Sequence, residues 1–196
     1  MLNWLLFNLQ TINLWYAIAG LLVLGLTVLL AYDYFYNAQR IYLRFFHSYI
    51  WAIIIVTSIG GASTTLLYSE VFGFIPCSLC WLQRVALYPQ ALMSVTAYRL
   101  KDTERYPLYG IVLSTFGFFV AVYQYIYQSL PQETLQSGLV PCLADGTADC
   151  SEKIIEVFGF VTFPFLSAVL FAFLIVLYLN LRRAGKSPKK IDYSIH

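Results

Sequence analysis

The sequence predicts an all-α integral membrane protein: a four-helix transmembrane bundle with an additional N-terminal transmembrane helix. Two observations predict this fold class. The first is composition, because 60% of the 196 residues are hydrophobic and only 11% are charged, whereas an ordinary globular domain carries about 25% charged residues. The second is the recurrence of uncharged stretches long enough to cross a bilayer, which takes about 20 residues of helix. A soluble core accounts for neither observation.

Five segments are expected to span the membrane. Their approximate bounds are 12–32, 45–69, 80–98, 106–130 and 157–181. The third is the least apolar because it contains Arg84, two glutamines and a proline. It is included because the topology requires a crossing at that place in the chain.

The chain divides into three parts on this interpretation. Residues 1–44 contain the additional helix and a cytoplasmic loop. Residues 45–181 form the four-helix bundle with an outer loop at 131–156, and residues 182–196 form a basic cytoplasmic tail.

Positive charge collects in the two connections predicted to follow the first and third segments, and in the tail. These stretches hold Arg40, Arg44, Arg99, Lys101, Arg105, Arg182, Arg183, Lys186, Lys189 and Lys190. Lys and Arg are enriched in cytoplasmic loops, so five crossings place the N-terminus outside and the C-terminus inside. Both cysteine pairs, Cys77 with Cys80 and Cys142 with Cys150, then lie on the outer face, where disulfides form and persist.

Cys77 and Cys80 form a Cys-x-x-Cys motif at the predicted start of the third membrane helix. Pro76 precedes the motif, which is typical of a loop-to-helix junction, and residues three apart share one face of a helix. The free N–H groups of a helix N-terminus also stabilise a thiolate. The motif therefore indicates a reducible disulfide, with a metal half-site and an inert structural disulfide as the alternatives.

Arg84 follows Cys80 by one helical turn and lies inside a predicted membrane segment. An arginine there is costly, which makes it a functional candidate by default, and its charge favours a nearby thiolate or another anion. The alternative is that Arg84 reaches the lipid headgroups and serves only as an anchor. Trp81 has two similar interpretations, as a side chain flanking a bound ring or as an interface anchor.

Cys142 and Cys150 lie in an acidic loop around the turn-forming dipeptide Asp145-Gly146. A disulfide closing this short loop would be open to attack by the thiolate of another protein. The alternative is a disulfide that only stiffens the loop. A zinc site built from all four cysteines is disfavoured, because the spacing of Cys142 and Cys150 exceeds the usual short ligand spacing. No metal is therefore expected.

The run Cys77-x-x-Cys80-Trp81-x-Gln83-Arg84 resembles the DsbB/BdbC family of membrane thiol:quinone oxidoreductases. The resemblance covers about residues 45–181 and includes the second cysteine pair, whose short spacing is similar to that of the BdbC-type branch. It implies an enzyme of the bacterial cytoplasmic (inner) membrane. Such an enzyme reoxidises a DsbA-like thioredoxin-fold thiol oxidase and passes the electrons to membrane quinone, either ubiquinone or menaquinone.

The resemblance also implies a role for each site residue. The partner oxidase would attack at Cys142, and the loop thiols would be reoxidised by exchange with Cys77–Cys80. Cys77 would face the loop and Cys80 the quinone, which Arg84 would hold and polarise. The expected partners are thus the soluble oxidase and membrane lipid, with no nucleic acid.

Two other functions remain open from the sequence. A vitamin-K-epoxide-reductase-like enzyme also uses a membrane Cys-x-x-Cys and a loop pair, but there the loop pair comes first in the chain, whereas here it follows. The other alternative is a non-catalytic membrane protein with two structural disulfides. That interpretation explains neither Arg84 nor a Cys-x-x-Cys motif at the start of a membrane helix.

Overall fold

The computed structural model describes residues 8–36, 49–130, 150–151 and 153–185. These residues form the helices α2 (Leu9–Phe35), α4 (Ile50–Leu66), α5 (Ser78–Leu100), α6 (Tyr106–Ser129) and α8 (Phe163–Gly185). A π-helix, η2 (Leu67–Val71), continues α4. A small antiparallel hairpin of β1 (Glu156–Val157) and β2 (Val161–Thr162) precedes α8. The predicted all-α membrane fold is confirmed.

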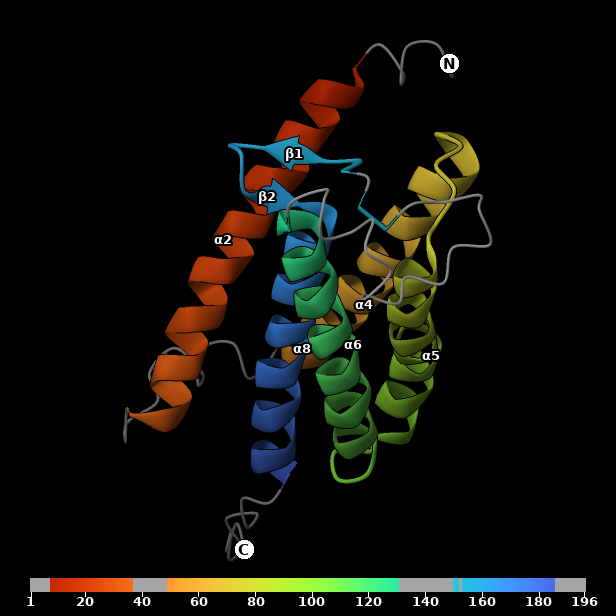
Figure 1. Cartoon of the computed structure of the whole chain (residues 1–196). Helices are drawn as coiled ribbons and strands as arrows, with labels where there is room; N and C mark the ends of the chain where they lie inside the picture. Colours follow the sequence, from red (N-terminus) through yellow and green to blue (C-terminus); the bar gives the residue numbers. More distant parts are fainter. Residues whose placement is uncertain (1–7, 37–48, 131–149, 152, 186–196) are drawn as a thin grey trace, which may run out of the picture.

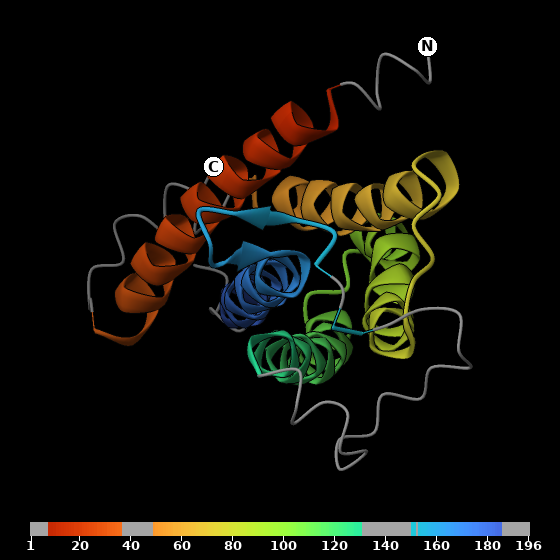
Figure 2. The ribbon, with the colours of Figure 1, turned by 45° about the horizontal axis from the view of Figure 1, so that its top comes forward.

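The helices α4, α5, α6 and α8 pack in that order around a common core, with α8 closing against α4 (Figure 1). The additional helix α2 lies outside this bundle and packs against α8, as Figure 2 shows from a second direction. Among the described helices, four are long and apolar enough to cross a membrane. They are Leu9–Phe35, Ile50–Val71, Tyr106–Ser129 and Phe163–Arg183. The chain is therefore a multi-pass membrane protein.

The helix α5 has 23 residues, enough to cross a bilayer, but it carries two glutamines and two arginines. Gln83, Arg84, Gln90 and Ser94 are all buried in it. Because these side chains face neighbouring helices, their polarity lowers the hydropathy of α5 without exposing polar groups to lipid. This burial explains why the sequence signal for the third segment is weak although the helix belongs to the bundle.

The last predicted segment, 157–181, is wrong at its start. Val157 pairs with Val161 and Glu156 with Thr162 in the hairpin, and α8 begins only at Phe163. The hairpin turn passes through Phe158 and Gly159, which both have positive φ, and glycine adopts that conformation without steric cost. Hydropathy could not locate this boundary because residues 157–162 carry no charge, like the first part of the helix that follows.

Two glycines of α6 set its close approach to α8. A Cβ atom at Gly110 would collide with the ring of Tyr178, and one at Gly117 would collide with the ring of Phe171. Both pairs are seven residues apart on their own helices, so the same face of each helix is used along two turns. Small residues that admit a neighbouring side chain are a common device of membrane helix packing.

The two ends of the bundle differ in chemistry. The hairpin end consists of the β1–β2 hairpin, the start of α5 and the end of α6, and it contains Cys77, Cys80 and Cys150. The opposite end contains the connection from α5 to α6 and the end of α8 (Figure 1). The described basic residues of that opposite end are Arg99, Lys101, Arg105, Arg182 and Arg183. Five of the seven described Lys and Arg residues thus lie at the end opposite the thiols, and the other two, Arg84 and Lys153, lie on the thiol side.

Candidate active site

Cys77 and Cys80 occupy the first turn of α5. Cys77 is the N-cap, with extended φ and ψ of −71° and 171°, and its carbonyl accepts a hydrogen bond from the N–H of Trp81. Both cysteines are free thiols, and their sulfur atoms lie 3.1 Å apart, with Cys77 as the donor. The predicted helix start at the motif is therefore confirmed. The pair is placed for disulfide formation within one helical turn.

The two thiols differ in how they hold their proton. Cys77 is buried, and its pKa is raised above the ordinary value of a cysteine. The main cause is the hydrogen bond that it donates to Cys80, followed by burial and by the proximity of the Cys80 charge. Cys77 therefore keeps its proton in the reduced pair, and the sulfur of Cys80 is the one that accepts.

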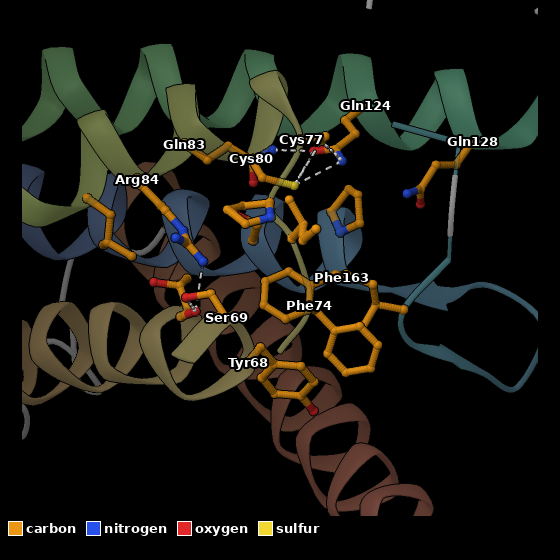
Figure 3. Close-up of a pocket in the computed structure, with 17 residues that line it drawn as sticks. Tyr68, Ser69, Phe74, Cys77, Cys80, Gln83, Arg84, Gln124, Gln128 and Phe163 are labelled. Carbon is orange, nitrogen blue, oxygen red and sulfur yellow. Dashed lines mark hydrogen bonds between the residues drawn. The ribbon is translucent and has the colours of Figure 1, made fainter. Parts of the chain in front are cut away.

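An amide from a second helix contacts both sulfur atoms. The Nε2 of Gln124, on α6, donates to Cys77 Sγ and to Cys80 Sγ at 3.4 Å each (Figure 3). The Oε1 of the same side chain accepts a hydrogen bond of 2.6 Å from Gln83 Nε2, on α5. Gln124 was not among the site residues predicted from the sequence. The available signal was a polar residue within the otherwise uncharged stretch 106–130, which does not by itself indicate what the residue contacts.

Cys150 is fully buried at the hairpin end and is bonded in a disulfide. It belongs to one apolar cluster with Cys77, Leu79 and Tyr127, against which Cys80 packs. The structure thus places Cys150 beside the Cys-x-x-Cys motif. Cys142 lies outside the described residues.

Two polar contacts hold Cys150 in this position. Ser78 Oγ, between the two cysteines of the motif, lies 3.9 Å from Cys150 Sγ. Gln128 Nε2 donates to the carbonyl oxygen of Cys150 at 3.2 Å. Gln128 follows Gln124 by one turn of α6, so the same helix face contacts both cysteine sites.

Arg84 is buried one turn below the thiols and points across to α4. Its guanidinium donates to the carbonyl oxygen of Thr65 at 2.8 Å. Thr65 belongs to the last turn of α4 before the π-helix, and π-helical segments occur frequently at functional sites. Arg84 therefore does not reach outward to solvent; it bridges two helices beside the thiols (Figure 3).

Trp81 lies half-exposed on the outer side of α5. Its ring stacks on the guanidinium of Arg84, with 5.2 Å between the guanidinium carbon and the ring centroid. Trp81 does not line the cavity beside the thiols, whereas Arg84 does. Trp81 can therefore affect that cavity only through its contact with Arg84.

A cavity of about 60 Å³ opens beside the thiols. Cys77, Cys80, Gln83, Arg84 and Gln124 supply its polar wall. Tyr68, Phe74, Leu87 and Phe163 are among its apolar lining residues. A larger apolar cavity of about 210 Å³ lies between α2, α4 and α8. The two share Thr65, Leu87, Phe163 and Ser167 in their walls.

Comparison with known proteins identifies the family. The family model "Disulfide bond formation protein DsbB" matches residues 47–181, which agrees with the extent of the resemblance seen in the sequence. This match covers the whole bundle. The chain belongs to the DsbB family.

Relatives with assigned names support the same family. Disulfide bond formation protein C of Bacillus subtilis is 34% identical over 137 residues, which cover 70% of this chain and 91% of the relative. The SPbeta prophage-derived disulfide bond formation protein B of Bacillus subtilis is 36% identical over 133 residues, covering 68% and 85%. A probable disulfide formation protein of Coxiella burnetii is 34% identical over 142 residues, covering 68% and 87%. No solved structure matches the chain.

Family membership assigns a general activity. The chain is a membrane disulfide oxidoreductase of the disulfide bond formation family. The helix α2 lies before the matched region.

Proposed function

We propose that the protein reoxidises a DsbA-like thioredoxin-fold thiol oxidase and passes the electron pair to membrane quinone. One observation carries the proposal: Cys150, itself in a disulfide, packs against Cys77 beside a cavity that also contains Cys80 and Arg84. These groups form a continuous path from a loop disulfide to a buried positive charge. An inert structural disulfide needs no such path.

The first half of the reaction is thiol–disulfide exchange. A thiolate of the partner attacks the loop pair at Cys142, the partner leaves oxidised, and Cys142 and Cys150 are left reduced. Cys150 then attacks Cys77 of the oxidised motif and releases Cys80 as a thiolate. Attack of Cys142 on Cys150 restores the loop disulfide, and both electrons now reside on Cys77 and Cys80.

The bonding of the described cysteines is compatible with these proposed steps. Cys77 and Cys80 are thiols, and Cys150 is in a disulfide. Returning the motif to its oxidised form breaks two S–H bonds, forms one S–S bond and releases two electrons and two protons. A bound quinone supplies an acceptor for two electrons and two protons.

The residues around the thiols fit a quinone in chemistry. Arg84 provides a fixed positive charge and a forked donor for a carbonyl oxygen. Phe74, Phe163 and Leu87 provide an apolar surround for a ring. We propose that Arg84 orients the acceptor and stabilises negative charge on it, while Trp81 holds Arg84 from the outer side of α5.

The available space fits when the two cavities are taken together. An apolar cavity of about 150 Å³ binds benzene, and the 60 Å³ beside the thiols is smaller than that. We propose that the neighbouring 210 Å³ cavity, which shares wall residues with the first, supplies the additional volume and an apolar wall suited to a polyprenyl chain. Tyr16, Gly20 and Val23 of α2 contribute to that wall, which gives the additional helix a place in the proposed binding site.

We infer the orientation from charge. Five of the seven described basic residues lie in the α5–α6 connection and at the end of α8, opposite the thiols, and Lys and Arg are enriched on the cytoplasmic side. We therefore place Cys77, Cys80 and Cys150 at the outer face of the bacterial cytoplasmic membrane, where a soluble oxidase can reach the loop. The tail then lies in the cytoplasm.

The proposal is tested with purified full-length protein and two alternative electron donors. With a reduced thioredoxin-fold oxidase and a short-chain quinone, the wild type is expected to bleach the quinone absorbance catalytically. Cys150→Ser is expected to abolish turnover with the oxidase but to retain turnover with dithiothreitol, which reduces Cys77–Cys80 directly. Absence of quinone reduction by the wild type with both ubiquinone and menaquinone analogues contradicts the proposal.

The matched control for Cys150→Ser is Ser129→Ala, at the exposed end of α6, where the hydroxyl contacts only the carbonyl of its own helix. Its turnover should equal that of the wild type with both donors. A membrane-impermeant maleimide applied to intact cells tests the orientation. In protein whose own cysteines are replaced, Ser129→Cys places the label at an exposed position of the same end of the bundle. Labelling only after the cells are permeabilised contradicts the outer placement.

A further inference from the structure

The contact between Gln124 and the two thiols is set by a second glutamine. Gln124 and Gln83 are both buried and come from different helices, α6 and α5. Gln83 Nε2 donates to Gln124 Oε1 at 2.6 Å, so the carbonyl of the Gln124 amide points toward Gln83. The Nε2 of that amide donates to Cys77 and Cys80, whose sulfur atoms both lie 3.4 Å away, whereas its Oε1 is farther from Cys80 Sγ, at 3.9 Å.

We propose that Gln124 is a catalytic residue that stabilises the Cys80 thiolate by hydrogen bonding, and that Gln83 is a positioning residue that fixes the orientation of the Gln124 amide. The inference rests on the proposed thiol oxidation, because it specifies which group favours the reactive form of the motif. Gln124 donates hydrogen bonds throughout and transfers no proton.

The physical need for such a donor follows from the surroundings of Cys80. The motif is in contact with an apolar cluster of Leu79, Tyr127 and Val120, and burying an anion without donors is costly. Hydrogen bonds to a charged acceptor are stronger than those between neutral groups. The donor of Gln124 is therefore most effective when Cys80 is a thiolate, which is the form that loses electrons.

The amide also matches both stages of the reaction. During exchange, attack of Cys150 on Cys77 expels Cys80 as a thiolate, and the Gln124 amide already faces that sulfur. During oxidation, Cys80 reacts as the thiolate after giving up its proton, the S–H bond of Cys77 breaks and one S–S bond forms between the two residues. Two electrons pass to the quinone acceptor of the proposed function, and the protons from Cys80 and Cys77 make up the two protons that it takes up. A donor touching both sulfurs favours the anion at whichever sulfur carries the charge.

The positive charge of Arg84 also favours a thiolate at Cys80, but Arg84 is anchored to a different helix from Gln124. Its guanidinium is hydrogen-bonded to the Thr65 carbonyl on α4, whereas Gln124 reaches the sulfurs from α6. The two side chains are therefore separable by mutation. Removal of the amide leaves the Arg84 contact with α4 in place.

The test measures the thiolate directly, without quinone or partner. In full-length protein carrying Cys77→Ser, Cys142→Ser and Cys150→Ser, the rate of iodoacetamide reaction at Cys80 is followed against pH. Gln124→Met, which keeps the length of the side chain but removes the donor, is expected to slow the reaction at neutral pH about tenfold and to shift the profile upward by about one pH unit. An unchanged profile overturns the assignment of Gln124.

The role of Gln83 is tested by a double-mutant cycle. Gln83→Met alone is expected to shift the same profile upward by less than Gln124→Met, because the amide remains but can rotate. In the presence of Gln124→Met, the additional effect of Gln83→Met should vanish. Additive shifts show that Gln83 acts independently and overturn the positioning role.

Ser114→Ala is the matched control, since Ser114 is a buried polar residue of α6 that contacts Gln90 instead of the thiols. It should leave the Cys80 profile unchanged; a shift equal to that of Gln124→Met would assign the effect to general loosening of α6 and overturn the proposal. The alkylation assay also separates the two hypotheses. If the wild type fails to reduce quinone while Gln124→Met still shifts the profile, the proposed function fails and the role of Gln124 in stabilising the thiolate stands.

Discussion

Gln124 and Gln90 are two buried glutamines of the same helix bundle, and their partners differ in kind. Gln124 contacts two sulfur atoms and the amide of Gln83, and it lines a cavity. Gln90 Oε1 accepts hydrogen bonds of 2.9 Å from Ser114 Oγ and from Tyr178 Oη, and its Nε2 donates to the Ala86 carbonyl. One amide faces reactive atoms, and the other joins three helices.

The comparison shows that burial of a polar residue in a membrane bundle does not reveal its role. Gln90 is 1% exposed and Gln124 is 3% exposed, so exposure does not distinguish them. What distinguishes them is the partner. Hydroxyl and carbonyl partners make the Gln90 cluster a structural link between helices, whereas thiol partners beside a cavity make the Gln124 cluster a site for chemistry.

The largest effect is expected at the thiols themselves. Cys80→Ala should abolish quinone reduction with every thiol donor, because no disulfide can form in the motif. It should leave thermal unfolding within about 1 kcal/mol of the wild type, since a partly exposed sulfur is replaced by a methyl group. Quinone bleaching and a detergent-phase unfolding assay measure the two quantities. Residual catalytic bleaching would place the electron exit elsewhere.

Arg84→Met is expected to have the next largest effect. Loss of a preorganised charge near the acceptor should slow quinone reduction about 100-fold, while exchange between the partner oxidase and the loop pair is much less affected. Single-turnover mixing with quinone and a separate trap for the mixed disulfide distinguish the two steps. Equal slowing of both steps would show that Arg84 acts by holding α5 against α4 through Thr65.

Substitution of Gln90 should lower the stability of the fold and leave the reaction rate unchanged. Gln90→Leu leaves the hydroxyls of Ser114 and Tyr178 without their acceptor, which is expected to lower the free energy of unfolding by about 1–3 kcal/mol. Turnover per folded molecule should stay near that of the wild type. Measuring the stability and turnover of Gln90→Leu and Gln124→Met side by side is the sharpest check that one glutamine is structural and the other acts in the chemistry. A Gln90 variant that folds normally but turns over slowly contradicts it.

The sequence predicted the parts of this molecule that depend on composition and local pattern. Long uncharged stretches predicted the apolar helices, and Pro76 before Cys77 predicted the start of α5 at the motif. The boundary before α8 was missed, because residues 157–162 carry no charge and the hairpin is defined by strand pairing and by the positive φ of Gly159.

The candidate site was predictable only in part, because some of its contacts join residues that are far apart in the sequence. Cys77, Cys80 and Arg84 share one helix, so spacing alone places them together. Gln124 is 40 residues further along the chain, and its contact with the thiols depends on the packing of α6 against α5. That packing follows from side-chain shape along both helices, which a single sequence does not reveal. The distribution of Lys and Arg predicted that Cys150 and Cys77 lie on the same side of the membrane. Nothing in the sequence predicted that the two residues pack against each other.

Cys77 and Cys80 should also differ in how fast they react with an alkylating reagent. Cys77 has a raised pKa because it donates to Cys80 and is buried, so it stays protonated to a higher pH than an ordinary cysteine. In reduced protein carrying Cys142→Ser and Cys150→Ser, brief iodoacetamide treatment at neutral pH should modify Cys80 about tenfold faster than Cys77. Peptide mass spectrometry measures the ratio, which should fall as the pH rises.

Burial alone could also slow Cys77, and Cys80→Ala separates the two causes. Without its acceptor, Cys77 should titrate at lower pH, and its labelling profile should shift downward. If the profile stays in place and only the maximal rate changes, limited access explains the difference and the hydrogen bond between the thiols does not.

The smallest effect is expected at Trp81, where the sequence left two interpretations. Its ring contacts Arg84 but does not line the cavity. A cation–π contact at a half-exposed position contributes about 0.5–1 kcal/mol, so Trp81→Leu should slow quinone reduction by about two- to fivefold through looser positioning of Arg84. The same substitution in an Arg84→Met background should then have no further effect on the rate. A persistent effect in that background would show that the indole contacts the acceptor itself, which would require α5 to rotate toward the cavity when the acceptor binds.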